Sequence, residues 1–90
     1  QERERMSLRR RFERAQKRVW RLSSPPSDEA LLELYALFKQ GSEGDCSGRP
    51  RGNLKERWKW KFWKRLEGTP KDDAMLRYCD MVDALMSAGG

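Results

Sequence analysis

Two short stretches of the sequence combine aromatic rings with basic side chains at spacings suited to a phosphorylated, ring-containing ligand. Tyr35 and Lys39 are four residues apart with Phe38 beside the lysine, so on a helix they share one face. Residues 57–65 read Arg-Trp-Lys-Trp-Lys-Phe-Trp-Lys-Arg and contain no acidic residue. A ring surface suits a nucleotide base, and charge-assisted hydrogen bonds suit its phosphates. Taken alone, both stretches also fit core aromatics whose flanking lysines are solvated.

The residues that enzymes most often use are missing or explained by other roles. The chain contains no His, the commonest general base, and neither Cys46 nor Cys79 has a suitable base beside it in the sequence. No glycine-rich phosphate loop and no metal-ligand spacing is present. Acidic pairs at 28–29 and 72–73 fall in the first turns of predicted helices, where they interact favourably with the helix dipole. We therefore expect no enzyme activity, no catalytic residue, no metal and no cofactor.

The composition limits the elements that can position the candidate side chains. Val19, Thr69 and Val82 are the only β-branched residues, which nearly excludes a fold rich in strands. Ninety residues suffice for one small domain over 1–90. No apolar run approaches the roughly 20 residues of a membrane span, and no secretory segment is visible. We expect a soluble, cytoplasmic monomer whose two cysteines are free thiols.

Apolar periodicity predicts four helices. Between Leu8 and Leu22 apolar residues recur at steps of four and three, as on one face of a helix. Ser27 and Asn53 are predicted N-caps, and Gly41 is predicted just past the end of the second helix. The predicted helices cover about 4–22, 28–41, 54–67 and 70–88. Because four amphipathic helices can bury their apolar faces only against each other, we predict an all-α fold, a single four-helix bundle.

Short segments spread over most of the chain, from Phe12 to Leu85, carry a resemblance to a known family. They are Phe12-Glu13-Arg14-Ala15, Pro26-Ser27-Asp28-Glu29, Tyr35-Ala36-Leu37-Phe38-Lys39-Gln40, Gly44-Asp45-Cys46, Arg49-Pro50, Lys59-Trp60 with Trp63, Gly68-Thr69, and Lys71-Asp72-Asp73-Ala74-Met75 with Tyr78. With these residues the chain resembles the acyl-CoA-binding proteins, small four-helix carriers also called diazepam-binding inhibitor. The resemblance implies a bundle of that type, and an intracellular carrier or buffer of medium- to long-chain fatty acyl-CoA thioesters.

The resemblance also implies which residues meet the CoA head group. Tyr35 and Lys39 would meet the 3′-phosphate region of the adenosine, with the lysine as counter-charge. Lys59 would be a second phosphate lysine, and Tyr78 a phenol on the adenine side. Phe38 stands where the family usually has a further tyrosine. The chain therefore keeps a ring at position 38 but lacks its hydroxyl group.

For the acyl chain, the resemblance implies a shallow groove between helices. Leu31 and Leu32 would border this groove and Lys55 would lie at its rim. Trp58 fills a position that is usually a small alanine, so its indole would narrow or re-line the groove, or simply stack on its neighbours. Trp20 stands where the family commonly has a lysine near the CoA phosphates, which makes it a further candidate contact.

The basic segment at residues 1–22 is also compatible with an anionic partner other than acyl-CoA. Residues 1–22 hold nine basic and three acidic residues. A candidate phosphate-tracking face consists of Arg9, Arg10, Arg11, Arg14, Lys17, Arg18 and Arg21. The alternatives are therefore a small helical nucleic-acid-binding module or a module on an anionic membrane surface. We favour the acyl-CoA carrier, with no nucleic acid expected and transient contacts to an anionic membrane or to acyl-CoA-using enzymes as further candidate partners.

Overall fold

The computed structural model describes residues 2–89, and the side chains of residues 7–88. Its elements are α1 (Glu2–Arg18), a 3₁₀ turn η1 (Val19–Arg21), α2 (Asp28–Glu43), α3 (Leu54–Lys64) and α4 (Lys71–Gly89). The described part of the chain contains no strand, so the predicted all-α fold is confirmed. None of the described helices is both long and apolar enough to cross a membrane.

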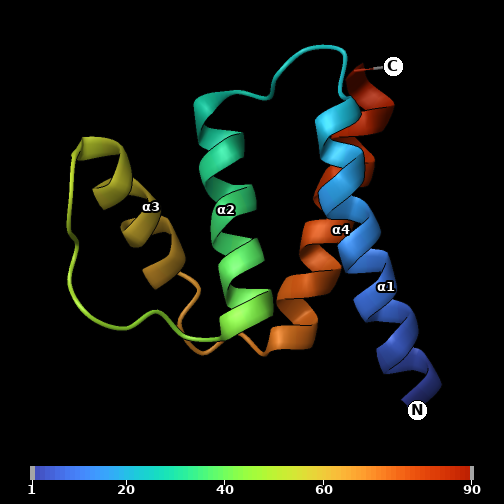
Figure 1. The fold of residues 1–90 in the computed structure, drawn as a ribbon, viewed down its shortest axis with the longest axis horizontal. Helices are drawn as coiled ribbons and strands as arrows, with labels where there is room; N and C mark the ends of the chain where they lie inside the picture. Colours follow the sequence, from blue (N-terminus) through green and yellow to red (C-terminus); the bar gives the residue numbers. More distant parts are fainter. Residues whose placement is uncertain (1, 90) are drawn as a thin grey trace.

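The four helices form a flat bundle. α2 stands in the middle and packs against α3 on one side and α4 on the other, while α1 packs along α4 (Figure 1). The molecule measures 36 × 34 × 15 Å along its principal axes. This flatness leaves α3 at the outer edge, where its interactions with α2 and with the two loops beside it hold it in place.

Both predicted N-caps are present. The Oγ of Ser27 accepts a hydrogen bond from the backbone N–H of Ala30 at 3.1 Å, and α2 begins at the next residue. The Oδ1 of Asn53 accepts one from the N–H of Glu56 at 2.9 Å, at the start of α3. Each cap satisfies a backbone donor that the first helical turn leaves without an intrahelical partner.

The end of α2 differs from the prediction. The helix continues past Gly41 to Glu43, and Gly44, at φ +89°, makes the cap by donating its N–H to the carbonyl of Gln40. Gly41 is instead a packing residue, because a Cβ there would lie 3.1 Å from Met75 Cγ and 3.2 Å from Phe12 Cζ. The absent side chain lets α2 approach the helices on that side closely.

Two other helices end earlier than predicted. α1 is α-helical only to Arg18 and then tightens into η1, so the predicted range 4–22 covers two conformations. α3 ends at Lys64 rather than near 67, because the N–H of Leu66 bonds to the carbonyl of Trp63, three residues back, as in a 3₁₀ turn. Helix ends commonly tighten in this way, which apolar periodicity does not reveal.

The hydrophobic core lies where α1, α2 and α4 meet. Its buried side chains are Phe12, Ala15, Leu34, Leu37, Ala74, Met75, Tyr78, Cys79 and Val82. The ring of Phe12 stacks on Phe38 with centroids 6.2 Å apart and meets Tyr78 edge-on at 5.2 Å. Cys46 and Cys79 are both buried as free thiols. The chain has few β-branched residues, and aromatic, sulfur-containing and leucine side chains fill most of the core in their place.

Ion pairs join the outer face of α1 to α4. Arg18 Nη1 lies 2.8 Å from Asp83 Oδ1, and Arg11 Nη2 lies 3.1 Å from Asp83 Oδ2 and 3.3 Å from Asp80 Oδ1. Hydrogen bonds from Arg18 and Arg11 lower the pKa of Asp83 below its ordinary value. A depressed pKa means that the folded state is stabilised where Asp83 is ionised, and that this stabilisation is lost as the pH falls through that pKa.

We predict that Asp83→Asn lowers the free energy of unfolding at pH 7 and lowers it less at pH 3, because the stabilisation by the Asp83 carboxylate is lost as the pH falls towards and through its lowered pKa. Urea unfolding followed by circular dichroism at the two pH values measures this difference. Asp80→Asn, which removes a single longer contact to Arg11, should cost less at pH 7. An Asp83→Asn effect of equal size at both pH values would contradict the electrostatic explanation.

Candidate ligand-binding site

An apolar cavity of about 530 Å³ lies between η1, the first half of α2 and the middle of α4. Its lining residues are aliphatic, proline or aromatic: Val19, Trp20, Leu22, Pro25, Pro26, Leu31, Leu34, Tyr35, Phe38 and Tyr78. Its volume falls within the usual range for small-molecule sites, and no charged side chain lines it. The cavity therefore offers ring and aliphatic surfaces, and any charged contacts must come from its surroundings.

Tyr35 connects the cavity to the basic side chains of α3. It lines the cavity from α2, and Lys59 Nζ lies 5.1 Å from the centroid of its ring. Lys59 also lies 3.7 Å from the exposed carboxylate of Glu56, one turn earlier on α3. The packing of α2 against α3 thus brings together two candidate residues that are far apart in the sequence.

Lys39 lies one turn after Tyr35 on the same helix. Its ammonium group is 5.0 Å from the centroid of the Trp63 ring and forms an ion pair with Glu43. Glu43 is largely exposed, and ion pairs of this kind contribute little to stability. Lys39 is therefore held in place by an aromatic ring, and an incoming anion could replace its carboxylate partner at small cost.

Phe38 and Tyr78 form the deep side of the cavity. Tyr78 is buried, and this burial raises the pKa of its phenol above the ordinary value. Both rings contact Phe12 of α1, which packs them against the core. The structure thus brings Tyr35, Phe38 and Tyr78 together around one cavity and places Lys59 against the first of them.

A hydrogen-bond network around the buried side chain of Gln40 fixes α3 relative to α2. Gln40, fully buried, donates from Nε2 to Asp45 Oδ1 and to the Thr69 carbonyl, both at 2.8 Å. The same Asp45 oxygen accepts the N–H of Gly68 at 2.9 Å. The hydrogen bonds from Gly68 and Gln40 lower the pKa of Asp45. This network ties the end of α2 to both loops that flank α3.

Two tryptophans of α3 add to this attachment. Trp63 Nε1 donates to the carbonyl of Gly44 at 2.8 Å, and Trp60 Nε1 donates to the carbonyl of Ser47 at 3.3 Å. Part of the aromatic run in residues 57–65 therefore holds the helix to the preceding loop. The sequence analysis assigned no positioning role to Gln40 or Asp45. A single amide and a loop carboxylate do not indicate such a role until their hydrogen-bond partners are known.

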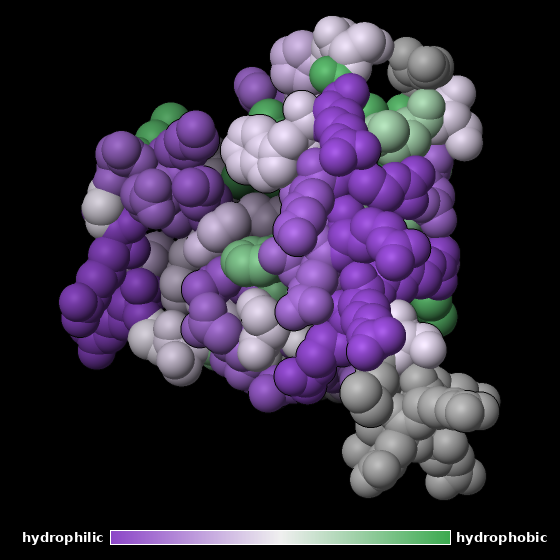
Figure 2. Space-filling view, turned by 45° about the vertical axis from the view of Figure 1, so that its right-hand side comes forward, coloured by the Kyte–Doolittle hydropathy of each residue, from purple (hydrophilic) through white to green (hydrophobic). Residues whose placement is uncertain are grey.

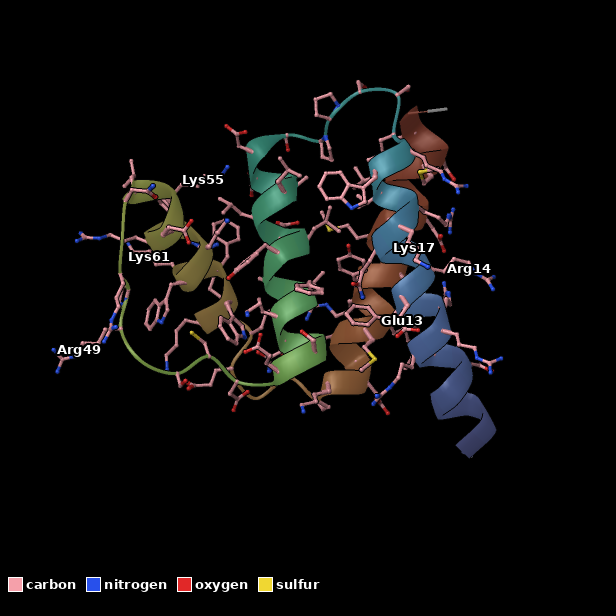
Figure 3. All side chains as sticks on the ribbon, viewed as in Figure 1. Glu13, Arg14, Lys17, Arg49, Lys55 and Lys61 are labelled. Carbon is pink, nitrogen blue, oxygen red and sulfur yellow. The ribbon has the colours of Figure 1, made fainter. Side chains whose placement is uncertain are left out.

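The candidate acyl-groove residues do not all lie together. Leu31 lines the cavity and is 45 % exposed, whereas Leu32, Lys55 and Trp58 do not line it. The Trp58 ring is partly exposed, lies edge-on to Phe62 at 6.3 Å and has Lys61 Nζ 5.0 Å from its centroid. Lys55 and Lys61 both lie on α3, at the opposite side of the flat molecule from Lys17 of α1 (Figure 3).

Trp20, the further candidate, lies at the edge of the cavity. It belongs to η1 and is 87 % exposed although it also lines the cavity. Its indole therefore has one surface toward the cavity and most of its area in solvent. Among the described residues, no group of three or more His, Cys, Asp or Glu side chains is placed to hold a metal ion.

Comparison with known proteins connects this chain to one family. A family model described as "Acyl CoA binding protein" matches residues 9–82. An acyl-CoA-binding protein of Saccharomyces cerevisiae is 42 % identical over 78 residues, which cover 84 % of this chain and 90 % of the relative. An acyl-CoA-binding protein homolog of Manduca sexta is 42 % identical over 88 residues, 94 % of this chain and 98 % of the relative.

A solved structure supports the same assignment. The crystal structure of Oryza sativa acyl-CoA-binding protein 2 is similar with a TM-score of 0.84 and 36 % sequence identity, covering 90 % of this chain and 92 % of that one. Sequence and fold therefore agree over nearly the whole described chain, including the elements that carry the cavity and the flanking lysines. The chain belongs to the acyl-CoA-binding protein family.

Proposed function

We propose that this chain binds fatty acyl-CoA thioesters and acts as a carrier or buffer for them without catalysing a reaction. The observation that carries the proposal is the apolar cavity bordered by Tyr35, with Lys59 against its ring and Lys39 one turn away. An acyl-CoA combines a base, several phosphates and a long apolar chain. It therefore needs ring surfaces, cations and an apolar groove close together, which is the combination found here.

The two lysines suit the phosphates of the head group. Lys39 and Lys59 each lie over an aromatic ring and beside an exposed glutamate. A phosphate carries more charge than a single carboxylate. When Lys39 leaves Glu43, or Lys59 leaves Glu56, to pair with a phosphate, the lysine gains charge-assisted hydrogen bonds at small cost. The Tyr35 hydroxyl is a further donor near these lysines, because Lys59 Nζ lies 5.1 Å from the centroid of the ring that carries it.

The cavity suits the base and the neighbouring part of the ligand. Phe38 and Tyr78 offer ring surfaces that pack against Phe12 before any ligand binds, and a preformed site loses less conformational entropy when it binds. Phe38 can stack but cannot donate a hydrogen bond. Trp20 adds a large ring at the cavity edge without supplying a cation, so we assign more of the phosphate binding to Lys39 and Lys59.

The acyl chain extends along the apolar side chains near the start of α2 and on α3. Leu31 lines the cavity and is exposed, and we assign the chain beyond it to Leu32 and Trp58, with Lys55 at the rim, although these three lie outside the cavity lining. Each buried CH₂ contributes about 0.8 kcal/mol, and ordering the ligand and site offsets part of it. Affinity should therefore rise with chain length until the apolar surface is covered.

A nucleic-acid role is less well supported than an acyl-CoA role. Arg11 and Arg18, two of the basic residues that would track a phosphate backbone, are ion-paired with Asp80 and Asp83 of α4. The other described basic residues of α1, Arg9, Arg10, Arg14 and Lys17, are exposed or partly exposed on its hydrophilic outer face (Figure 2), and within residues 7–18 no aromatic side chain is exposed among them. The aromatic rings near cations lie at the cavity and on α3 instead. A cytoplasmic, monomeric carrier remains our expectation.

We predict that Tyr35→Ala and Lys39→Ala each weaken palmitoyl-CoA binding strongly without unfolding the protein. Loss of one charge-assisted phosphate contact costs roughly 1.5 to 3 kcal/mol, or about 10- to 150-fold in Kd. Lys59→Ala should cost less, since the Lys59 side chain is 29 % exposed against 21 % for Lys39. Isothermal titration measures the affinities, and circular dichroism checks the fold. Lys64→Ala, which removes a lysine paired with Glu67, is the matched control, and an equal loss there would contradict the assignment.

A second prediction concerns the part of the ligand that is recognised. Palmitate should bind far more weakly than palmitoyl-CoA, because the free acid lacks the phosphates and the base that Lys39, Lys59 and the cavity rings would contact. Titration of both ligands near physiological salt, with duplex DNA as a third ligand, tests this. Equal affinity for palmitate and palmitoyl-CoA would show that these residues do not bind CoA, and tight DNA binding that persists in salt would favour the nucleic-acid alternative.

A third prediction concerns Trp58. Trp58→Ala should shift the preferred acyl chain length, because removing a partly exposed indole shortens the apolar surface that α3 offers to an acyl chain. A series of acyl-CoA lengths titrated against both proteins measures the shift. Trp58→Phe, which keeps a ring, should shift it less. An unchanged profile in Trp58→Ala would mean that this side chain only packs against Phe62.

A further inference from the structure

A second cavity lies on the other side of α2 from Tyr35. Its volume is about 290 Å³, and it shares no lining residue with the apolar cavity of the candidate ligand site. Glu33 and Leu37 line it from α2. Each is two residues from Tyr35, and side chains two residues apart on a helix point in nearly opposite directions. The body of α2 therefore separates the two cavities, and we call the second one the back groove.

The back groove has an apolar floor flanked by two arginines. Arg65 lies just past the end of α3 and Arg77 lies on α4, and both side chains are exposed. The floor residues are buried or partly buried: Ala36, Leu37, Phe62 and Leu66. The groove thus offers an apolar surface with a guanidinium group contributed by each of two neighbouring elements.

Contacts along α3 extend the groove into a basic surface. The guanidinium carbon of Arg65 lies 4.4 Å from the centroid of the Phe62 ring. Phe62 meets the partly exposed Trp58 edge-on at 6.3 Å, and Lys61 Nζ lies 5.0 Å from the centroid of the Trp58 ring. Trp58, Lys61 and Arg65 follow at steps of three and four, so they lie on one face of the helix. Direct contacts between rings and cations therefore join this face of α3 to the groove.

This surface carries more positive than negative charge. Lys61, Arg65 and Arg77 form no ion pair with any side chain in the described range 7–88. Glu33 is the one acidic residue among the described residues that line the groove, and Asp73, which shares a neighbouring cavity with Arg77, does not pair with it. A guanidinium group can donate two parallel hydrogen bonds to one carboxylate. Both arginines are therefore available to carboxylates of a partner.

We propose that the back groove docks an acidic segment of a partner protein, in which a large apolar side chain stands between carboxylates. The apolar side chain would occupy the floor of the groove, and the carboxylates would pair with Arg65 and Arg77, with Lys61 beside them. A volume of about 290 Å³ is at the lower end of the range for small-molecule sites, and it suits one anchoring side chain.

The shape and charge of the groove favour a peptide over other anionic partners. Its apolar residues form a concave floor and do not protrude, so they fit a protruding side chain better than the surface of a lipid bilayer. Glu33 within the groove would repel the continuous phosphates of a nucleic acid. The face of the Trp58 ring is already occupied by Lys61, which leaves little ring surface for a base to stack on.

Docking at the back groove leaves the candidate ligand site free. Neither Arg65 nor Arg77 lines the cavity beside Tyr35, and α2 lies between the two surfaces. The partner would therefore bind this protein in the presence or absence of acyl-CoA. The inference does not rest on the proposed function.

Fluorescence anisotropy with a labelled acidic peptide tests the proposal. The probe is Asp-Glu-Asp-Phe-Leu-Asp-Glu-Asp with fluorescein at its N-terminus, measured at low and at physiological salt. We expect saturable binding that weakens as salt screens the charges. One control peptide has Asn and Gln in place of the acidic residues, and the other has Ser in place of Phe and Leu. Each should bind about tenfold more weakly, because the first lacks the carboxylates and the second lacks the apolar anchor.

Two variants test where the peptide binds. Arg65→Gln and Arg77→Gln should each raise the Kd of the acidic peptide about fivefold, as expected for the loss of one exposed ion pair. Arg14→Gln is the matched control and should change the Kd little, because Arg14 is an exposed arginine of α1 on the far side of the molecule from α3 (Figure 3). All three variants should keep the affinity for palmitoyl-CoA, and circular dichroism checks their fold.

Several results would overturn the proposal. Equal binding of the acidic and neutral peptides, no binding of the acidic peptide at low salt, or an equal loss in Arg14→Gln would each show that the groove does not recognise an acidic segment. An oligonucleotide or an anionic vesicle that binds more tightly than the peptide, and that Arg65→Gln weakens, would make nucleic acid or lipid the occupant. Peptide binding without palmitoyl-CoA binding would refute only the proposed function, and the reverse would refute only the docking.

Discussion

The position of α3 depends on one buried side chain, Gln40. Its amide group joins the end of α2 to Asp45 in the loop before α3 and to Thr69 in the turn after it. Its Oε1 has no partner among the described residues, so the network is retained despite one unsatisfied buried acceptor. Because the molecule is a flat layer and α3 lies at its outer side, these hydrogen bonds substitute for the packing that a thicker bundle would provide.

The candidate site depends on that placement. Lys59 approaches Tyr35, and Lys39 approaches Trp63, only because α3 is held beside α2. In both cases a ring and an exposed carboxylate hold the ammonium group before any ligand arrives. The two ammonium groups are thus oriented before a ligand binds. Their ion pairs with glutamate are weak enough for an anionic ligand to replace the glutamate. Tyr35 also lines the apolar cavity, whose walls include the buried Leu34 and Tyr78 and the exposed Trp20.

Much of the fold could be predicted from residue types and spacing. Apolar periodicity located four helices, and Ser27 and Asn53 cap two of them as expected. The prediction was wrong at Gly41, which lies inside α2 because Phe12 and Met75 pack where a side chain would be. It was also wrong about the end of α3, where backbone hydrogen bonds tighten the last turn. Both errors concern contacts or backbone geometry that local patterns do not encode.

The sequence by itself determined the helical fold class, the family and the kinds of side chain available for binding, because composition, capping residues and motif spacing are local properties. Only the tertiary structure decided which of those side chains meet. It placed Tyr35, Phe38 and Tyr78 around one cavity, kept Leu32, Lys55 and Trp58 off its walls, and left Trp20 mostly in solvent. The physical reason is that such groupings depend on how helices pack across the flat layer, and long-range contacts such as those of Gln40 fix that packing.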